Sequence, residues 1–411
     1  MAGGEVKTLA LVSLGCAKNA VDLQVRAGAL IKEGGYRLSP DPDRADAVIV
    51  NTCAFIASAR EEAEREIVRA LRLKARGQYG RVIVAGCYPQ RYPDARAKFP
   101  GVDSWEGVPK TWESQKVPGL RLTGKAFAYL KIAEGCSHRC AYCAIPAIRG
   151  KFRSRPMADI LDEARALVKS GCRELNIVAQ DPMVWREGKA KLCDLLWALD
   201  RLKGDFWVRV LYSYPSEITE PFVDWLNRAK HAVKYIDVPL QHTVPEVLAR
   251  MNRRGAIEAS LLAADVLREA VPGVTLRTTI MTGFPGETPV RFQRLMSDLK
   301  RMQFDRLGAF AFSPEKGTAA ATMPGRPSRR TAEERERAVM RLAADIWRLR
   351  AQRLVGQTFR ALVVAPGVAR LESQAPDVDG VTYVDGAAEV GEFVDVRLTG
   401  VRGFDLEGAL A

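Results

Sequence analysis

The chain has 411 residues, which at roughly 150 residues per domain predicts two or three domains. Its composition, 47% hydrophobic and 27% charged, is that of a globular protein and excludes a disordered or collagen-like chain. Apolar runs such as Leu9–Leu14 fall far short of the ~20 residues that span a bilayer. The first six residues do not form a signal segment. We therefore expect a cytoplasmic protein that does not contact a membrane.

Lysine and arginine total 62 against 49 acidic residues, a net charge of +13. A basic surface is typical of proteins that bind a polyanion such as RNA or the ribosome. A soluble protein with surplus basic residues explains the same charge equally well.

The eight cysteines are not expected to form disulfides, because the cytoplasm keeps thiols reduced. Metal binding or catalysis is the remaining explanation for so many thiols. Only three histidines are present (His138, His231 and His242), which disfavours a zinc-finger protein.

The first third of the sequence alternates short apolar strands with helices. We expect strands at Thr8–Ser13, Ala47–Val50 and Arg81–Ala85, and helices at Val21–Lys32 and Glu61–Arg76. Apolar β-branched strands separated by helices predict a parallel sheet covered on both faces.

A cysteine closely follows each of these three strands: Cys16, Cys53 and Cys87. Ligands of open α/β sheets bind outside the carboxyl ends of the strands. One such cysteine would be explained as a buried small hydrophobe. Three in the same setting favour a set of ligands that converge in space.

After a turn-rich link over residues 108–124, six more strands alternate with helices such as Met157–Lys169 and Ser260–Ala270. The expected strands are Ala128–Ile132, Glu174–Ala179, Phe206–Tyr212, Tyr235–Val238, Val274–Met281 and Leu307–Phe312. Repeated βα units predict a barrel. Because the segment is shorter than the ~250 residues of an eight-unit barrel, we predict an incomplete one of six units.

The C-terminal part begins with a predicted helix at Thr331–Leu354. Short strands follow at Phe359–Val364, Val381–Val384 and Phe393–Leu398, which predict a small all-β barrel. The expected fold class is therefore α/β with a small all-β module, and the expected domains are residues 1–120, 121–348 and 349–411.

Cys136, Cys140 and Cys143 form a C-x₃-C-x₂-C loop after the first barrel strand. Three thiolates on one tight loop do not complete a four-ligand zinc site, and a fourth ligand from His138 within the same loop would be strained. The three can hold three irons of a cubane and leave the fourth iron open to a small molecule.

The loop, with Tyr142 before its last cysteine and a βα barrel around it, resembles that of the radical S-adenosylmethionine (SAM) enzymes. The resemblance implies that Cys136, Cys140 and Cys143 are catalytic ligands of a 4Fe-4S cluster. The open iron would bind SAM, which the reduced cluster cleaves to a 5′-deoxyadenosyl radical.

Adding the three N-terminal cysteines, the whole chain resembles the methylthiotransferases, which carry two 4Fe-4S clusters. Residues 13–22 (SLGCAKNAVD) and 375–380 (APDVDG) are similar to the RimO type, which modifies an aspartate of ribosomal protein S-twelve. The stretches at 131–156, 239–242 (PLQH) and 283–288 (GFPGET) are shared by the wider family. The alternatives are the MiaB type, which modifies a tRNA adenosine, and a binding module whose clusters are structural.

The resemblance implies that Cys16, Cys53 and Cys87 hold the second cluster. It also implies an electron donor such as flavodoxin or ferredoxin, a substrate that is free or on the ribosome, and possible RNA contact through the basic surface. We expect side chains that contact SAM at strand ends: Tyr142, Gln180, Asp181, Gly283, Gly286 and Glu287. Each has a structural alternative, such as a strand-to-helix turn capped by Thr288. Gln24 and Gln180-Asp181-Pro182 depart from the family pattern, and Cys172 and Cys193 are expected to be structural.

Overall fold

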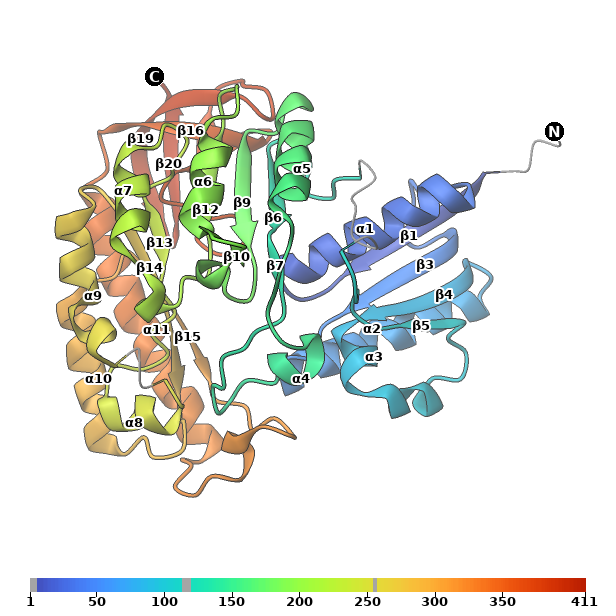
Figure 1. Ribbon diagram of the computed structural model, residues 1–411, viewed down its shortest axis with the longest axis horizontal. Coiled ribbons are helices and arrows are strands. Elements are labelled where there is room, and N and C mark those ends of the chain that lie inside the picture. The colour runs from blue at the N-terminus through green and yellow to red at the C-terminus, as the bar shows by residue number, and fades with distance from the viewer. Residues whose placement is uncertain (1–5, 113–119, 254–256) are drawn as a thin grey trace. The chain divides into compact units, whose positions relative to one another are not determined.

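A computed structural model describes residues 6–112, 120–253 and 257–411 (Figure 1). The chain forms two compact units. The first, here called the N-terminal unit, comprises the chain up to Leu122 together with two later segments, Glu134–His138 and Cys143–Arg155. The second, here called the barrel unit, comprises Thr123–Ala133, Arg139–Tyr142 and Pro156–Ala411. No described helix is both long and apolar enough to cross a membrane.

The N-terminal unit contains a five-stranded parallel sheet of order β2-β1-β3-β4-β5. The sequence predicted a parallel sheet and its three central strands, and the short edge strands β2 and β5 were not predicted. Its strands are β1 (Lys7–Ser13), β2 (Tyr36–Leu38), β3 (Ala45–Thr52), β4 (Tyr79–Gly86) and β5 (Ser104–Glu106). Its helices are α1 (Ala17–Gly34), α2 (Ala57–Ala75), α3 (Cys87–Arg91) and α4 (Ile145–Arg149), with a 3-10 helix at Pro93–Lys98.

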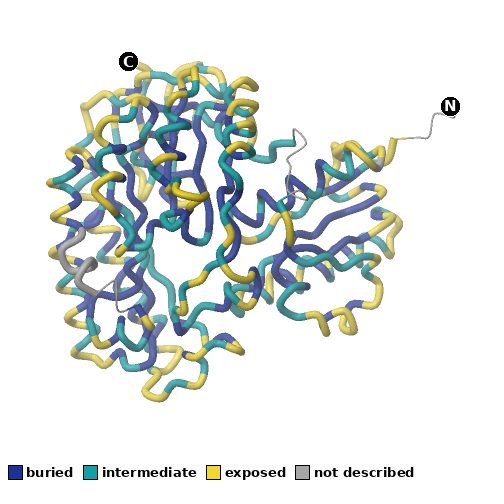
Figure 2. The backbone as a smooth tube through the Cα atoms, in the orientation of Figure 1, coloured by how far each residue is buried: buried dark blue, intermediate teal, exposed yellow. Residues whose placement is uncertain are grey.

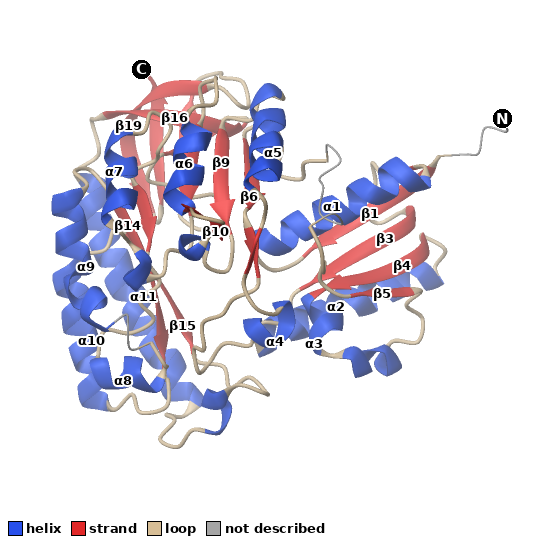
Figure 3. Cartoon of the chain, in the orientation of Figure 1, coloured by secondary structure: helices blue, strands red, loops and turns tan. Residues whose placement is uncertain are grey.

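Both faces of this sheet are buried, because successive side chains of a strand point to opposite sides and a helix covers each side. Val48 and Val50 pack with Ile67 of α2 in one cluster. Ala47 and Ile49 pack with α1 in the other. Figure 3 shows the two helices on opposite faces of the sheet.

The helices of the N-terminal unit begin closer to the cysteines than the sequence suggested. Helix α1 starts at Ala17 rather than Val21, so Cys16 is its N-cap residue. Helix α3, which the sequence analysis did not predict, begins at Cys87 itself. The polar and small residues 17–20 hid the start of α1, because they lack the apolar periodicity that identifies a helix.

The barrel unit contains the six predicted parallel strands. They form two three-stranded sheets, β12-β9-β6 and β13-β14-β15, and a parallel bridge joins Val208 to Ala232. The strands are β6 (Phe127–Lys131), β9 (Glu174–Val178), β12 (Trp207–Val210), β13 (Tyr235–Asp237), β14 (Thr275–Thr282) and β15 (Arg306–Ala311). The helices are α5 (Met157–Lys169), α6 (Leu192–Asp200), α7 (Glu220–Arg228), α8 (Pro245–Arg250), α9 (Ile257–Ala270) and α10 (Pro289–Met302). Figure 2 shows the strands as buried and the helices as partly exposed.

The C-terminal part of the barrel unit is a long helix followed by a closed five-stranded barrel. The helix, α11 (Arg329–Gln352), packs on β14 and β15 and is capped by Ser328, which accepts a hydrogen bond from Thr331 N. The barrel has the order β16-β17-β18-β20-β19. Its strands are β16 (Thr358–Ala365), β17 (Val368–Leu371), β18 (Thr382–Asp385), β19 (Phe393–Arg402) and β20 (Asp405–Leu410). Strands β17 and β20 were not predicted, because their runs VARL and DLEGAL are short and interrupted by charged residues or glycine.

Candidate functional site

The three cysteines predicted to converge lie at one edge of the N-terminal sheet. The register pairs Ser13 with Asn51 and Asn51 with Ala85, so β1, β3 and β4 end together. Cys16, Cys53 and Cys87 follow in the next few residues and are exposed, half-buried and buried, respectively.

Two glycines allow the loops that carry these cysteines to approach one another. Gly15 has φ +89°, and a Cβ there would lie 2.7 Å from Cys53 Cβ and 3.1 Å from Cys53 Sγ. Gly86 has φ +96°, and a Cβ there would lie 2.7 Å from the Thr52 carbonyl oxygen. Any larger residue would separate the loops.

Asn19 joins the same loops through hydrogen bonds. The side-chain Nδ2 of Asn19 donates to Leu14 O at 2.7 Å, and the backbone carbonyl oxygen of Asn19 accepts from Asn51 Nδ2 at 2.7 Å. These contacts hold the loop after β1 and the end of β3 against the first turn of α1, whose N-cap residue is Cys16.

The three thiols are electrostatically coupled. Burial raises the pKa of Cys87 to about 12 and also raises the pKa of Cys53, and the charge of Cys16 adds to both shifts. Desolvation acts to raise the pKa of Cys16 as well. The positive charges of Lys18 and Arg149, together with the backbone N–H of Asn19, outweigh desolvation, and the pKa of Cys16 is lowered.

This donor set fits an iron–sulfur cluster. Thiolates are the ligands that iron–sulfur clusters take, and the two glycines provide the close approach of the three loops. Among the described residues, no three histidine, cysteine or carboxylate side chains are placed to hold a single metal ion. A cubane cluster does not need three ligands around one ion, because each of its irons binds a separate thiolate.

Arg149, at the end of α4, lies beside these thiols with only 1% of its side chain exposed. Its Nη2 is 3.3 Å from Cys87 Sγ and 3.3 Å from Asn19 Oδ1. Its Nη1 is 2.9 Å from Asp22 and 3.0 Å from Glu134. Sequence reasoning missed this residue, because only folding brings it to the cysteines more than sixty positions earlier.

The start of the three-cysteine loop is fixed within the N-terminal unit. Gly135 has φ +73°, and a Cβ there would lie 2.3 Å from Lys151 O. Cys136 N donates to Gly150 O at 3.1 Å, and Ser137 Oγ accepts from Phe152 N at 3.2 Å. The backbone at the first cysteine is therefore held by residues 150–152.

The middle of the loop is held within the barrel unit. Ala141 N donates to Met251 O at 2.9 Å, and Asn252 Nδ2 donates to Arg139 O at 2.7 Å. Buried Arg253, which sequence reasoning also missed, lies 3.8 Å from Cys140 Sγ and 3.4 Å from Tyr142 Oη. The Tyr142 ring packs edge-on against Phe284.

The glycines predicted to contact SAM follow β14 and have internal neighbours. A Cβ on Gly283 would lie 2.2 Å from Ala332 Cβ of α11. A Cβ on Gly286 would lie 2.7 Å from Arg250 Cδ at the end of α8. Close packing against α11 therefore requires Gly283, whereas at Gly286 the constraint is the positive φ of +95°, since the Arg250 side chain can move. The role of both glycines toward SAM stays a prediction.

The Glu287 carboxylate is buried and engaged. It accepts hydrogen bonds from Gly283 N at 2.9 Å and Arg335 Nη1 at 2.6 Å, and His242 Nε2 is 3.3 Å from its other oxygen. Burial acts to raise the pKa of Glu287, but these partners outweigh it and the pKa is lowered. Thr288 caps α10, as the structural alternative for this turn required, and accepts a hydrogen bond from Arg291 N at 3.3 Å.

Gln180 and Asp181 follow β9 at its carboxyl end. Asp181 is buried and accepts a hydrogen bond from Met183 N at 3.1 Å, which caps a 3-10 turn. Gln24, which departs from the family pattern, is buried and accepts from Leu122 N at 2.9 Å. The neutral amide of Gln24 thus holds the chain at Leu122, where the first segment of the N-terminal unit ends.

Comparison with known proteins assigns three regions of the chain. Residues 130–299 match the radical SAM superfamily, residues 8–107 match the uncharacterized protein family UPF0004, and residues 355–410 match the TRAM domain. A solved structure of the radical SAM methyltransferase TsrM from Kitasatospora setae, with cobalamin and a [4Fe-4S] cluster bound, is similar in fold. It has a TM-score of 0.54 and 16% identity over 77% of this chain and 74% of that chain.

The fold and the three-cysteine loop define a radical SAM protein, a class that uses SAM and a 4Fe-4S cluster. The ribosomal protein uS12 methylthiotransferase RimO of Syntrophus aciditrophicus (strain SB) is 40% identical over 96% of each chain. RimO of Desulfitobacterium hafniense (strain Y51) is 37% identical over 98% of each. The chain belongs to the RimO family of methylthiotransferases.

Proposed function

We propose that this chain adds a methylthio group to the β-carbon of an aspartate in ribosomal protein uS12. Full-length similarity to proteins named for uS12 methylthiotransfer supports the substrate. The observation that carries the chemistry is the convergence of Cys16, Cys53 and Cys87 at one sheet edge, in addition to the radical SAM loop.

The two cysteine sets take different roles in this proposal. Cys136, Cys140 and Cys143 would hold the cluster that binds SAM, and Cys16, Cys53 and Cys87 would hold a second 4Fe-4S cluster. When bound, these groups supply a 5′-deoxyadenosyl radical and the sulfur to be transferred, with the methyl group from a second SAM. A radical is needed because the β-carbon hydrogen is too weakly acidic for a side-chain base at neutral pH.

The chain's own residues contribute order and charge. Gly15 and Gly86 let the three N-terminal loops meet, and Arg149 and Arg253 each place a buried cation beside one ligand sulfur. Both arginines would offset the negative charge of thiolate ligands. We propose Tyr142, Gln180, Asp181, Gly283, Gly286 and Glu287 as residues near SAM, with Glu287 acting through the Gly283 turn that it holds.

We further propose three domains: a methylthiotransferase domain (residues 1–120), a radical SAM domain (121–348) and a TRAM domain (349–411) that docks the substrate. A small electron-transfer protein such as flavodoxin or ferredoxin would reduce the clusters. The net charge of +13 supports contact with RNA when uS12 is bound on the ribosome. A ribosomal substrate also supports a cytoplasmic location.

The test compares a strain lacking the gene with strains that carry the wild type, Cys136→Ala, Cys53→Ala or Cys193→Ala. Mass spectrometry of uS12 peptides and of tRNA nucleosides would detect a methylthio group in place of hydrogen. We expect the uS12 aspartate to be modified with the wild type and with Cys193→Ala, a cysteine outside both sets, and unmodified with the other two. Modification of tRNA instead of uS12 would overturn the substrate, and modification with Cys53→Ala would overturn the second cluster.

A further inference from the structure

The guanidinium of Arg149 divides its contacts between two groups of acceptors. Nη1 forms ion pairs with the carboxylates of Asp22 and Glu134, and Nη2 donates hydrogen bonds to Asn19 Oδ1 and Cys87 Sγ. All of these residues lie in the N-terminal unit. An arginine fork is planar and rigid, so fixing Nη1 on the carboxylates also fixes the direction of Nη2.

The segment that carries Arg149 is anchored in the core. Ala144 and Ile148 are buried in the same hydrophobic cluster as Cys87 and Tyr88, and α4 packs beside α3. Arg149 therefore has little freedom to leave Cys87. At the other end of the contact, Glu134 also accepts a hydrogen bond from Gly135 N at 3.1 Å, directly before Cys136.

We infer that Arg149 is a positioning residue that links Cys87 of the N-terminal set to the start of the radical SAM loop, within the N-terminal unit. It connects the Cys87 sulfur, through one rigid group, to the Glu134-Gly135-Cys136 stem of the radical SAM loop. It also donates an N–H···S hydrogen bond to a ligand of the second cluster. This inference rests on the proposed function, because that function makes Cys87 a cluster ligand.

The inferred contact has a consequence for electron transfer. Hydrogen bonds to the sulfurs of an iron–sulfur cluster raise its reduction potential, because they stabilise the more negative reduced form. Lysine would keep the positive charge near Asp22 and Glu134, but its point-like ammonium does not reproduce the planar fork. Arg149→Lys should therefore separate the sulfur contact from the neutralisation of the carboxylates.

The experiment isolates the second cluster by replacing Cys136, Cys140 and Cys143 with alanine in the full-length chain. After anaerobic reconstitution, iron content, the circular dichroism spectrum and the midpoint potential by EPR-monitored titration are measured with Arg149 or Arg149→Lys. We expect the lysine variant to keep its fold and to shift the midpoint to a more negative potential. A midpoint that does not move would overturn the inference.

A matched control is Arg209→Lys, another fully buried arginine on a carboxylate, which lies in the barrel unit and whose contacts in the described part of the chain are with Glu174, Glu372 and Tyr235. The midpoint potential of its second cluster should equal that of the parent, which is the Cys136, Cys140 and Cys143→Ala chain with Arg149 and Arg209 intact. An equal shift in both variants would overturn the inference, because the effect would then not depend on the Cys87 contact.

A second measurement needs no substitution at Arg149 and covers the case in which that variant does not fold. In the parent labelled with ¹⁵N-arginine, pulsed ENDOR of the reduced cluster should detect coupling to an arginine nitrogen. Bound iron without this coupling would overturn the inference while leaving the second cluster intact. A parent that binds no iron would overturn the proposed second cluster itself, and with it the inference.

Discussion

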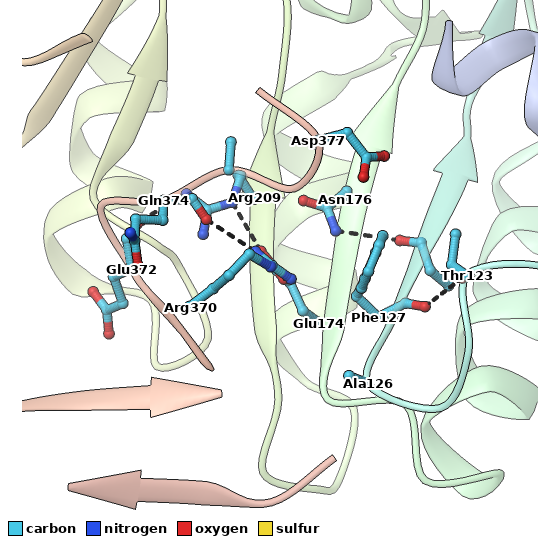
Figure 4. A network of polar contacts seen from close by, with 12 residues as sticks. Thr123, Ala126, Phe127, Glu174, Asn176, Arg209, Arg370, Glu372, Gln374 and Asp377 are labelled. Atoms are coloured by element: carbon cyan, nitrogen blue, oxygen red, sulfur yellow. Dashed lines mark hydrogen bonds and ion pairs between the residues drawn. The ribbon is translucent and has the colours of Figure 1, made fainter. Parts of the chain in front are cut away.

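Glu174, the first residue of β9, forms an ion pair with Arg370 of β17, and the two side chains are only 0% and 3% exposed (Figure 4). Arg209 of β12 binds the same carboxylate at 2.8 Å. Nearby, Tyr235 donates to Asp379 and Tyr129 donates to Asp377, each at 2.5 Å. These contacts join strands β6, β9, β12 and β13 to the small C-terminal barrel and the loop that follows its strand β17.

Replacing Glu174 with glutamine should destabilise the barrel unit strongly. Two buried guanidinium groups would lose their carboxylate, and uncompensated buried charges typically cost about 3–5 kcal/mol. Urea unfolding followed by tryptophan fluorescence and circular dichroism would measure the loss. Glu334→Gln, at an exposed pair with Arg330 on α11, is the control and should leave the unfolding curve unchanged. A similar curve for both variants would show that the buried cluster adds no stability.

The same cluster predicts a pH dependence. Burial acts to raise the pKa of Glu174, but Arg370 and Arg209 outweigh it, so the folded pKa lies below the ordinary value of 4.5. Such a group contributes stability that is fully present above pH 4.5 and is lost as the pH falls through the folded pKa. The difference in unfolding free energy between wild type and Glu174→Gln should therefore be constant from pH 7 to about pH 5 and shrink in more acidic solution. A difference that grows on acidification would contradict this assignment.

Gly15→Ala should impair iron binding at the N-terminal set. The positive φ alone costs roughly 1–2 kcal/mol for a non-glycine residue, and the new methyl group would overlap Cys53 Cβ at 2.7 Å. We expect iron per chain to fall toward half of the wild-type value, with the radical SAM cluster retained. Gly35→Ala, with φ +65° and no atom of the described residues within 4 Å of its Cβ, carries a similar strain without the contact. It should keep the full iron content, and equal losses in both variants would refute the role of the contact.

Gly283→Ala should destabilise the protein before SAM is added, because its methyl group would lie 2.2 Å from Ala332 Cβ. A double-mutant cycle with Ala332→Gly tests the cause. We expect the second substitution to recover part of the stability lost by the first, measured as the thermal unfolding midpoint without SAM. Gly273→Ala, with φ +81° and open space around it, gives the cost of strain alone. If the changes in unfolding midpoint of the two single variants simply add in the double variant, Gly283 is not needed for packing against Ala332.

The sequence predicted the elements whose local pattern is strong. The apolar runs of β1, β3 and β4 and the periodic helices α5 and α11 were all found near their predicted positions. The strands β17 and β20 were missed, because a closed barrel stabilises short, polar strands through pairing that no local window contains.

The three-cysteine loop and the three cysteines at strand ends were also predicted from the sequence, because their spacing and their position after apolar strands are local features. The sequence by itself determined the fold class and the family, and it predicted the two cysteine sets, whose role as cluster ligands stays a prediction. The tertiary structure alone decided that Arg149 lies against Cys87, that Gly283 is required by α11, and that Glu174 holds Arg370 almost two hundred residues later. Those contacts depend on burial and on the meeting of distant strands and helices, and neither leaves a periodic signal in the chain.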